Sequence, residues 1–427
     1  RRMSRAPERQ VVVTGLGFIS PIGNSPAEGE ASLRAGRHGL EVVKWFPECP
    51  VHVAGRIVGF DTQSENQNAW RWPPEYLVPR ETLRGLSPHG LYALCAVQQA
   101  LRHAGLPPEG PRDERTGLFT ASAGSTAAMR THLNQVFESG GTRVHPLGVL
   151  RTVAGTLNFN LAAHFRIRGA VTGFTSACAA SAHALGYACD EIRLGRHDRM
   201  IVVGAEEPVW ESLLPFDGAR ALTRSHDPET ASRPFDRRRD GFVGSGGAVA
   251  LILESRALAQ ARQAPLWCEL RGWAHTGDGH NPTWSDPTGD GLARAMALAL
   301  QDAELTPEEI DYVNAHATST LAGDRSEALA LRRVFHARSP RISSTKGLTG
   351  HPLSMSGALE AGLCALALQR GFVPGNAHLE QPDESCTGLD LPVETRDAEL
   401  RFVLSNSSGF GGSNVVLALA RAGAGFS

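Results

Sequence analysis

Cys178 has the type and the setting that suit covalent chemistry. It stands in the run Thr175-Ser176-Ala177-Cys178-Ala179-Ala180-Ser181, between an expected strand and an alanine-rich stretch with helical spacing. A thiol at the beginning of a helix lies near the positive end of the helix dipole, which favours the nucleophilic thiolate. Small neighbours let a thioester approach closely. A buried structural cysteine is the alternative interpretation of this segment alone. That alternative is favoured for five other cysteines: Cys49, Cys95, Cys189, Cys268 and Cys364.

His316 follows a short buried strand that we expect at residues 312–314. The segment reads Asn314-Ala315-His316-Ala317-Thr318-Ser319-Thr320. A histidine in such a loop can donate hydrogen bonds to an oxygen that gains negative charge during a reaction. The hydroxyls of Thr318 and Thr320 can hold a polar substrate arm such as phosphopantetheine. A polar turn is the alternative, which the density of Thr and Ser allows.

Lys346 and His351 belong to a third motif, Lys346-Gly347-Leu348-Thr349-Gly350-His351. A lysine near an active site can stabilise negative charge and orient other groups. Gly350 permits a tight approach of the backbone beside His351. Taken alone, the motif can also be the turn that enters a helix.

A glycine-rich loop, Gly409-Phe410-Gly411-Gly412, follows the strand expected at residues 402–405. Such a loop can cradle a phosphate or supply a backbone N–H group to an oxyanion. The phosphate interpretation is weak, because the GxxxxGK[ST] spacing and a following helix are absent.

Each of these motifs follows a short apolar stretch, and the stretches alternate with helical patterns. This alternation is typical of a mainly parallel, buried sheet in an α/β protein. The first strand, at 11–14, is expected to end in a tight turn at Gly15-Leu16-Gly17. The order of elements starts again near residue 259. We therefore expect an N-terminal half, 1–258, with the nucleophile, and a C-terminal half, 259–427, with the histidines. Duplication is a hypothesis, since no direct repeat can be counted.

The composition narrows the class of protein. The net charge is −2 over 427 residues, which suggests neither a nucleic acid nor an anionic membrane as partner. The seven cysteines form no CxxC pair, which favours a reducing compartment. The basic, polar first ten residues are no secretory signal, and no apolar run is long enough to span a bilayer. We expect a cytoplasmic enzyme without membrane insertion.

Taken together, the motifs resemble the β-ketoacyl-[acyl-carrier-protein] synthases of the thiolase-like superfamily. The likeness is strongest to 3-oxoacyl-ACP synthase I and extends to synthase II and to type II polyketide ketosynthases. It rests on segments in the same order along the chain: 13–17, 176–179, 204–207, 221–223, 233–236, 239–243, His316, 346–351 and 409–414.

The resemblance implies a fold and a reaction. The fold is a thiolase-like, five-layered αβαβα sandwich of two similar halves. The reaction is the decarboxylative Claisen condensation of a cysteine-bound acyl chain with malonyl-ACP in fatty acid biosynthesis. It gives a 3-oxoacyl-ACP that is two carbons longer. The family needs no metal and no cofactor beyond the phosphopantetheine arm of the acyl carrier protein. The expected partners are that carrier protein and a second copy of the chain, or a chain-length-factor-like subunit in a heterodimer.

The resemblance also implies a role for each site residue. Cys178 holds the acyl chain, while His316 and His351 stabilise the enolate that decarboxylation leaves. Lys346 supports the site electrostatically, and Glu327 orders it from behind. The N–H groups of Cys178 and Phe410 form the oxyanion hole, and Phe410 gates acyl entry. The expected substrate-binding residues are Thr318, Thr320, Ser125, Gly409 and Gly411. Carrier-protein docking is expected at Arg80, Arg84 and Arg151, although solvated surface arginines are the alternative.

Several positions depart from the family pattern, and they concern the acyl substrate. Ser408 stands where the family usually has Phe, and Ser413 stands where it has Thr. Ser354-Met355-Ser356 replaces a usual Gly-Ala-Ala run, and Ser125 falls where Gly or Ile is common. The His-Gly-Thr of the family is His316-Ala317-Thr318 here. A polyketide or polyene pathway is therefore the alternative to fatty acid synthesis.

Other thiolase-like proteins fit less well. A chain-length factor lacks the nucleophile that Cys178 supplies. A CoA-dependent thiolase carries a second cysteine on its last glycine-rich loop, where Ser408 stands here. Cys386-Thr387-Gly388 matches that C-x-G motif only by letter, well before the loop. A synthase III uses Cys, His and Asn rather than two histidines.

Overall fold

Short runs of aliphatic and β-branched residues form the strands of one large sheet. The structure is a computed structural model and describes residues 9–423. The strands of the first half are β1 (Val11–Ile19), β4 (Thr116–Ala121), β5 (Val171–Phe174), β6 (Arg199–Glu206) and β7 (Gly247–Ser255). Those of the second half are β8 (Cys268–Gly277), β9 (Tyr312–Asn314), β10 (Arg341–Ser343), β13 (Phe402–Gly409) and β14 (Ser413–Arg421). Two small sheets pair β2 (Leu40–Val42) with β3 (Val53–Gly55), and β11 (Phe372–Val373) with β12 (Arg396–Asp397).

The strand order of the first half is repeated in the second. The order is β5-β4-β6-β7-β1 in the first half and β10-β9-β13-β14-β8 in the second. Numbered along the chain within each half, both orders read 3-2-4-5-1. In each half the last strand is antiparallel to both of its neighbours, whereas the other neighbouring strands are parallel. The repeat confirms two similar halves, while the division at 258/259 stays a prediction.

The sheet is mixed, so the expectation of a mainly parallel sheet is wrong. The chain passes from β13 to β14 through a short turn, and a hairpin can join only antiparallel strands. The apolar pattern of the strands does not reveal this direction. The two halves meet where β1 pairs with β8, at Val12 and Val13.

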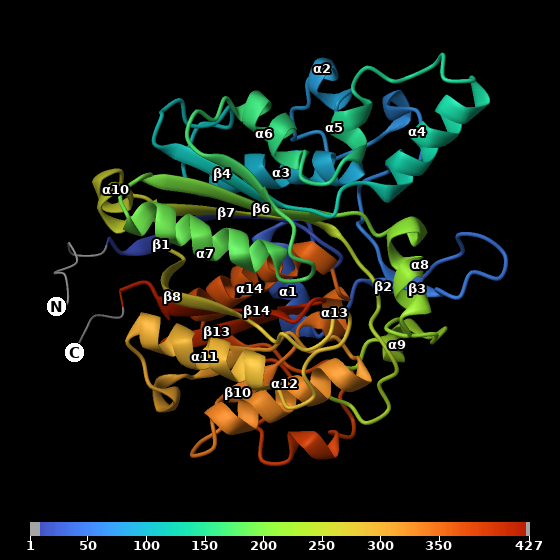
Figure 1. Cartoon of the computed structure of the whole chain (residues 1–427). Coiled ribbons are helices and arrows are strands. Elements are labelled where there is room, and N and C mark those ends of the chain that lie inside the picture. Colours follow the sequence, from blue (N-terminus) through green and yellow to red (C-terminus); the bar gives the residue numbers. More distant parts are fainter. Residues whose placement is uncertain (1–8, 424–427) are drawn as a thin grey trace.

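The five strands of each half form one half of the large sheet, called a half-sheet below. Helices and the two half-sheets stack in five layers (Figure 1). Helix α3 (Pro88–His103) covers β1, β6 and β7 from outside. Helices α7 (Ala180–Arg193) and α14 (Ser356–Arg370) fill the layer between the half-sheets and contact strands of both. Helix α11 (Asp290–Ala303) covers β8 and β14 on the far side, beside α12 (Leu321–Val334). This arrangement is the expected αβαβα sandwich.

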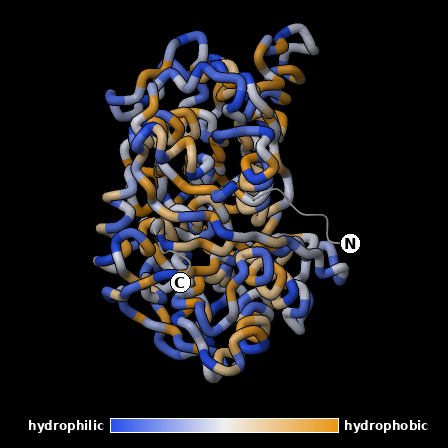
Figure 2. The backbone as a smooth tube through the Cα atoms, turned by 90° about the vertical axis from the view of Figure 1, so that its left-hand side faces the viewer, coloured by the Kyte–Doolittle hydropathy of each residue, from blue (hydrophilic) through white to orange (hydrophobic). Residues whose placement is uncertain are grey.

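The remaining helices are short or lie at the rim. They are α1 (Pro26–Ala35), α2 (Arg80–Leu83), α4 (Thr126–Glu138), α5 (Gly148–Thr152), α6 (Leu157–Phe165), α8 (Trp210–Gly218), α9 (Pro228–Ala231), α10 (Arg256–Ala261) and α13 (Lys346–Thr349). Four 3₁₀ turns are η1 (Gln67–Ala69), η2 (Pro307–Glu309), η3 (Leu353–Met355) and η4 (Glu384–Cys386). Hydrophobic segments run through the middle of the molecule (Figure 2). Among the described residues, no helix is both long and apolar enough to cross a bilayer.

Gly15 and Gly17 lie inside β1, so the expected turn is wrong. Strand β1 continues through both residues to Ile19, with a register shift between Val13 and Gly15. A Cβ atom at Gly17 would lie 2.0 Å from the carbonyl oxygen of Ala96, in α3. The glycines therefore serve the close approach of helix and strand, a role that sequence does not distinguish from a turn.

Candidate active site

Cys178 lies on a strained turn between β5 and α7. The residue before it, Ala177, has a φ of +49°, a left-handed conformation that costs about 1–3 kcal/mol. The backbone of Gly409 approaches this turn from β13. A Cβ atom at Gly409 would lie 3.1 Å from the nitrogen of Cys178. Small residues are thus required on both sides of the contact. The Cys178 side chain is buried at the floor of a cavity.

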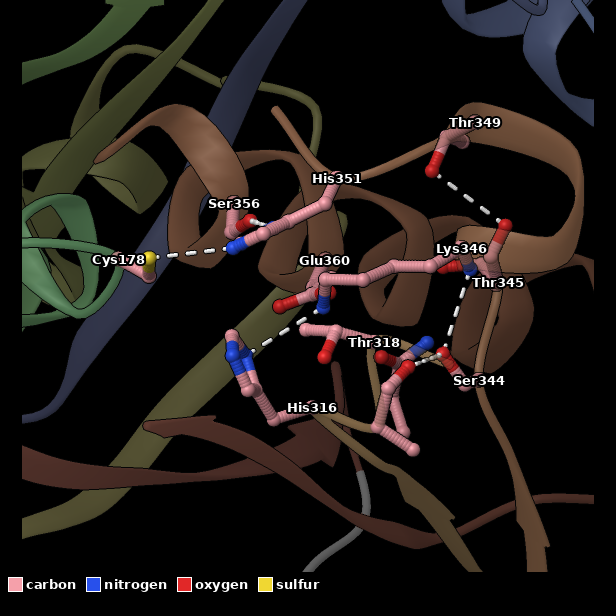
Figure 3. Close-up of polar contacts among 12 residues, drawn as sticks. Cys178, His316, Thr318, Ser344, Thr345, Lys346, Thr349, His351, Ser356 and Glu360 are labelled. Carbon is pink, nitrogen blue, oxygen red and sulfur yellow. Dashed lines mark hydrogen bonds and ion pairs between the residues drawn. The ribbon is translucent and has the colours of Figure 1, made fainter. Parts of the chain in front are cut away.

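The sulfur of Cys178 lies 3.1 Å from Nε2 of His351 (Figure 3). Burial raises the pKa of the Cys178 thiol to about 12, although the charge of Lys346 opposes the shift. Burial and then Lys346 hold the pKa of His351 well below its ordinary value. Desolvation thus opposes the thiolate that the helix dipole and Lys346 favour. Desolvation likewise favours the neutral imidazole of His351.

The backbone of His351 is clamped to the segment that follows Phe242. Its N–H group donates to the carbonyl of Val243 at 2.7 Å, and its carbonyl accepts from the Ser245 N–H at 3.0 Å. Gly350 has a φ of +66°, and a Cβ atom there would lie 3.0 Å from Ser245. This confirms the tight approach expected at Gly350. On the ring, Nδ1 lies 3.0 Å from the hydroxyl of Ser356, at the beginning of α14.

Lys346 is almost fully buried between a carboxylate and the second histidine. Its ammonium group forms an ion pair with Glu360 of α14 and lies 3.4 Å from Nδ1 of His316 (Figure 3). An ammonium group only donates, so Nδ1 of His316 accepts and Nε2 carries the proton. Burial, Lys346 and His351 together hold the pKa of His316 well below its ordinary value. His316 is thus a neutral imidazole fixed as an Nε2–H donor.

Two buried carboxylates of α12 hold the loop that carries His316. Glu327 accepts the N–H groups of His316 and Ala317, at 3.0 and 2.6 Å, and the amide of Asn406 at 3.0 Å. Asp324 accepts from the N–H group of Thr318 at 2.9 Å. The predicted position of Glu327 behind His316 matches this geometry.

The side chains of the motifs converge on a cavity of about 80 Å³. Cys178, His316 and His351 line it, as do Thr318, Thr320, Gly409 and Phe410. The hydroxyls of Thr318 and Thr320 lie 3.1 Å apart. Phe410 is 36% exposed, and its ring packs edge-on against Phe216 at a centroid distance of 5.4 Å. This aromatic pair stands at the cavity wall. Gly411 lies outside the lining residues.

Ser125 is buried but does not line this cavity. Its hydroxyl donates to Glu207 at 2.8 Å and accepts the N–H group of Ala128, which caps α4. Its assignment to the acyl pocket stays a prediction.

The three arginines expected to dock a carrier protein line a second, open cavity of about 1510 Å³. Arg80 and Arg84 are exposed, whereas Arg151 is half-buried. Burial lowers the pKa of Arg151, and its Nε has no hydrogen-bond partner. The structure thus gathers these residues on one face, although 67 positions separate Arg84 from Arg151.

A duplicated α/β sandwich with a buried cysteine that faces two histidines is typical of condensing enzymes. Comparison with known proteins identifies the family within this class. The family model "Beta-ketoacyl synthase, N-terminal domain" matches residues 8–259, and the corresponding C-terminal domain matches residues 267–380. The chain therefore belongs to the β-ketoacyl synthase family.

Three similar proteins illustrate this membership. The 3-oxoacyl-[acyl-carrier-protein] synthase 1 of Escherichia coli K12 is 37% identical over 423 residues, which cover 96% of this chain and 98% of that protein. A β-ketoacyl synthase from Burkholderia phymatum superposes with a TM-score of 0.88 at 34% identity, covering 97% of this chain and 99% of that one. The ishigamide ketosynthase/chain length factor superposes with a TM-score of 0.85 at 32% identity, with the same coverage.

Three residues of the site were missed in the sequence, namely Ser356, Glu360 and Asn406. Ser356 and Glu360 lie four positions apart, on one face of α14. A signal for Glu360 existed, because a buried lysine requires a counter-charge. Asn406 gave no such signal, since its role depends on β13 lying beside α12.

Proposed function

We propose that this protein is a ketosynthase. It transfers an acyl chain to Cys178 and condenses the chain with malonyl-ACP, with loss of CO₂, to give a 3-oxoacyl-ACP two carbons longer. The observation that carries the proposal is the buried Cys178–His351 contact beside a His316 whose tautomer Lys346 fixes. The reaction needs no cofactor besides the phosphopantetheine arm of the carrier protein. The seven cysteines are buried and form no disulfide among the described residues, which supports a cytoplasmic location.

The first step is acyl transfer to the thiol. The Cys178 sulfur attacks the thioester carbonyl, and its proton passes to Nε2 of the neutral His351. The N–H groups of Cys178 and Phe410 hold the oxyanion of the tetrahedral intermediate. Its collapse expels the pantetheine sulfur, which takes the proton from His351 and leaves as a thiol.

The second step is decarboxylation of the malonyl group. The bond to the carboxylate breaks, CO₂ leaves, and the electron pair passes to the thioester oxygen as an enolate. Between the two steps, Nε2 of His351 takes a proton from solvent and Nδ1 releases one. His316 and His351 then donate their Nε2–H groups to that oxygen, while Thr318 and Thr320 hold the pantetheine arm. No strong base is needed, so the site has only to stabilise negative oxygen.

The third step forms the new carbon–carbon bond. The enolate carbon attacks the Cys178 thioester, and the backbone N–H groups of Cys178 and Phe410 hold the second oxyanion, as they held the first. Cys178 leaves as a thiolate and takes a proton from water. Lys346 and Glu360 contribute by fixing His316, and Glu327 by fixing its loop.

The pathway is proposed to be fatty acid synthesis, in line with the relatives of that name. A type II polyketide or polyene pathway is the second candidate, because the ishigamide ketosynthase is similar over the whole chain. The serines at positions 125, 354 and 408 also favour it. Two of them point their hydroxyls at buried carboxylates, from Ser125 to Glu207 and from Ser354 to Glu206.

The proposed partners are an acyl carrier protein and a second subunit. The carrier protein would dock at the cavity lined by Arg80, Arg84 and Arg151, whose charges suit an acidic helix. The second subunit would pair with β5, the exposed edge strand of the large sheet. It is a second copy of this chain or a chain-length-factor-like subunit.

Intact-mass spectrometry tests the proposal. The protein is incubated with carrier proteins that bear different acyl chains, and then with malonyl-ACP. We expect one acyl group per chain at Cys178, followed by its loss as a product two carbons longer. The best chain assigns the pathway. The Cys178→Ala variant is the control and should remain folded but unacylated. Acylation of that variant would remove Cys178 from its role.

A further inference from the structure

Three metal-ligating side chains from distant parts of the sequence meet behind the active site. His38 precedes β2, Glu229 belongs to α9, and His378 follows β11. One ring nitrogen of each histidine and one carboxylate oxygen of Glu229 all lie within 4.8 Å of one another. The condensation chemistry uses none of them. Two imidazoles and one carboxylate, completed by water, are a ligand set with which proteins bind zinc. We infer that His38, Glu229 and His378 form a binding site for a divalent transition-metal ion such as Zn²⁺.

The ring of His378 is held by a backbone carbonyl. Its Nδ1 lies 2.8 Å from the carbonyl oxygen of Ser232, which can only accept. Nδ1 therefore carries the proton, and Nε2 has a free lone pair. A hydrogen bond from the other ring nitrogen to a backbone carbonyl is the support that metal-binding histidines commonly have. The backbone of His378, with a φ of +64°, holds the ring in this place.

His38 and Glu229 share a proton that the ion replaces. The N–H group of Leu40 donates to Nδ1 of His38 at 3.1 Å, so Nε2 carries the proton and donates to Glu229 at 2.9 Å. When the ion binds Nε2, the proton moves to Nδ1, and the contact with Leu40 is given up. This loss, together with a water as fourth ligand, predicts weaker binding than in a closed structural zinc site.

An ion can reach the site from solvent. The side chain of Glu229 is 73% exposed, and that of His38 is 16% exposed. Arg233 is a positive charge near His378, and its guanidinium donates to the carbonyl of Thr230 at 2.6 Å. The carboxylate of Glu229 offsets that charge. The three ligands come from loops and from one short helix, and these segments must move to bring together ligand atoms that now lie within 4.8 Å of one another.

The three segments that carry the ligands also hold the backbone of α13. The N–H group of Gly39 donates to the carbonyl of Leu348 at 3.0 Å. The hydroxyl of Ser232 donates to the carbonyl of Lys346 at 2.8 Å. Ala377 packs on Gly347, where a Cβ atom would lie 2.8 Å from the Ala377 oxygen. A bound ion would therefore link the three segments that hold the backbone of α13, the helix that begins with Lys346. It would do so from outside the active site.

Zinc binding in solution tests the inference without any measure of condensation. Titration calorimetry with ZnCl₂ is carried out on the full chain with Cys178→Ala, so that the Cys178–His351 pair contributes no thiolate ligand. We expect one Zn²⁺ per chain. His378→Asn and Glu229→Gln should each weaken it at least about tenfold. Asn tolerates the positive φ at position 378, so that variant should fold.

His52→Gln is the matched control. His52 and His226 stack at a centroid distance of 3.7 Å and are another histidine pair that can attract the ion. This variant should bind zinc as tightly as its parent. Hydrogen exchange gives a second measurement, since zinc should slow exchange of the Gly39 amide only where His378 is present. The inference is overturned if zinc fails to bind, or if it binds His378→Asn and its parent equally.

Discussion

His316 and His351 present the same ring nitrogen to the cavity but are fixed by different partners. Lys346 donates to Nδ1 of His316, which leaves a single tautomer. His316 does not contact the thiol, whereas His351 does. Replacing His316 should therefore impair different steps of the reaction from those that replacing His351 impairs.

His316→Ala should slow decarboxylation of malonyl-ACP by about 100-fold, the usual effect of losing one oxyanion donor. Acylation of Cys178 should continue, because His351 still accepts the proton. His351→Ala should impair both steps. Release of CO₂ and the mass of the acyl-enzyme, measured separately, check the difference. Equal loss of acylation in both variants would contradict the division of roles.

Ser356 leaves His351 free to change its tautomer. In the first step Nε2 accepts the thiol proton, so Nδ1 carries a proton and donates to Ser356. In the second step Nε2 must donate to the enolate, so Nδ1 must accept. A hydroxyl can act as donor or acceptor by rotating, and it therefore supports both states. Ser356 is a positioning residue, since it acts through His351.

Ser356→Ala should slow acylation and decarboxylation together, each by about tenfold or more, because Nδ1 loses its partner in a buried site. Ser356→Thr keeps a hydroxyl and should recover part of each rate. Ser354→Ala is the control, since that hydroxyl bonds to Glu206 and not to His351. Rates for Ser356→Ala that match the wild type in both steps would show that the hydroxyl has no such role.

At the scale of the element, Gly17 sets the distance between β1 and α3. A Cβ atom at this position would meet the carbonyl oxygen of Ala96 at 2.0 Å and the nitrogen of Ala100 at 2.9 Å. The backbone of α3 cannot move aside as the end of a flexible side chain can. Gly17→Ala should lower the free energy of unfolding by about 1–3 kcal/mol, measured by chemical denaturation. Gly218→Ala, with nothing within 4 Å, should change it by less than about 0.5 kcal/mol. Equal effects would mean that helix and strand separate at little cost.

The end of β6 carries Glu206, a buried carboxyl that makes stability depend on pH. Burial raises its pKa from 4.5 to about 7, against hydrogen bonds from Ser354 and Ala123. The folded protein thus binds this proton more tightly than the unfolded chain does. The contribution of Glu206 to stability is full below pH 4.5 and falls as the pH rises to about 7.

Glu206→Gln should remove this dependence. Relative to the wild type, the variant should gain stability between pH 4.5 and 7, by up to about 3 kcal/mol. Urea denaturation of both proteins across this range measures the difference, and groups common to both cancel. A difference that stays constant with pH would show that Glu206 ionises normally in the fold.

At the scale of the molecule, short sequence motifs predicted most of the site residues. They did not predict which distant segments of the chain pack together. Cys178, His316 and the Lys346–His351 motif could be found because each stands in a short, chemically distinct segment after a strand. Glu360 could not, since only the packing of α14 brings it to Lys346. Glycines also look alike in sequence, so close packing at Gly17 was mistaken for a turn. The direction of β7 and β14 depends on connections that carry no apolar signal.

The large sheet ends at β5 in an edge that nothing in the sequence protects. Val171, Thr172 and Gly173 are exposed, and β5 contains neither lysine nor proline. Among the described strands it pairs only with β4. Tyr187 of α7, 39% exposed, extends the apolar surface beside it. An open, apolar edge is a template for another strand, and we expect a second copy of the chain to pair with it antiparallel across a two-fold axis.

Val171→Lys combined with Tyr187→Lys should therefore convert a dimer into a monomer, because each charge meets its own copy near the axis. Light scattering should give twice the chain mass of 45.6 kDa for the wild type and the single mass for the variant. Condensation should fall as well, since the exposed Ala177 beside Cys178 lies in the turn that follows β5 in the chain. Val393→Lys, 53% exposed and outside the large sheet, should stay dimeric. A folded double variant that remains a dimer would place the subunit contact elsewhere.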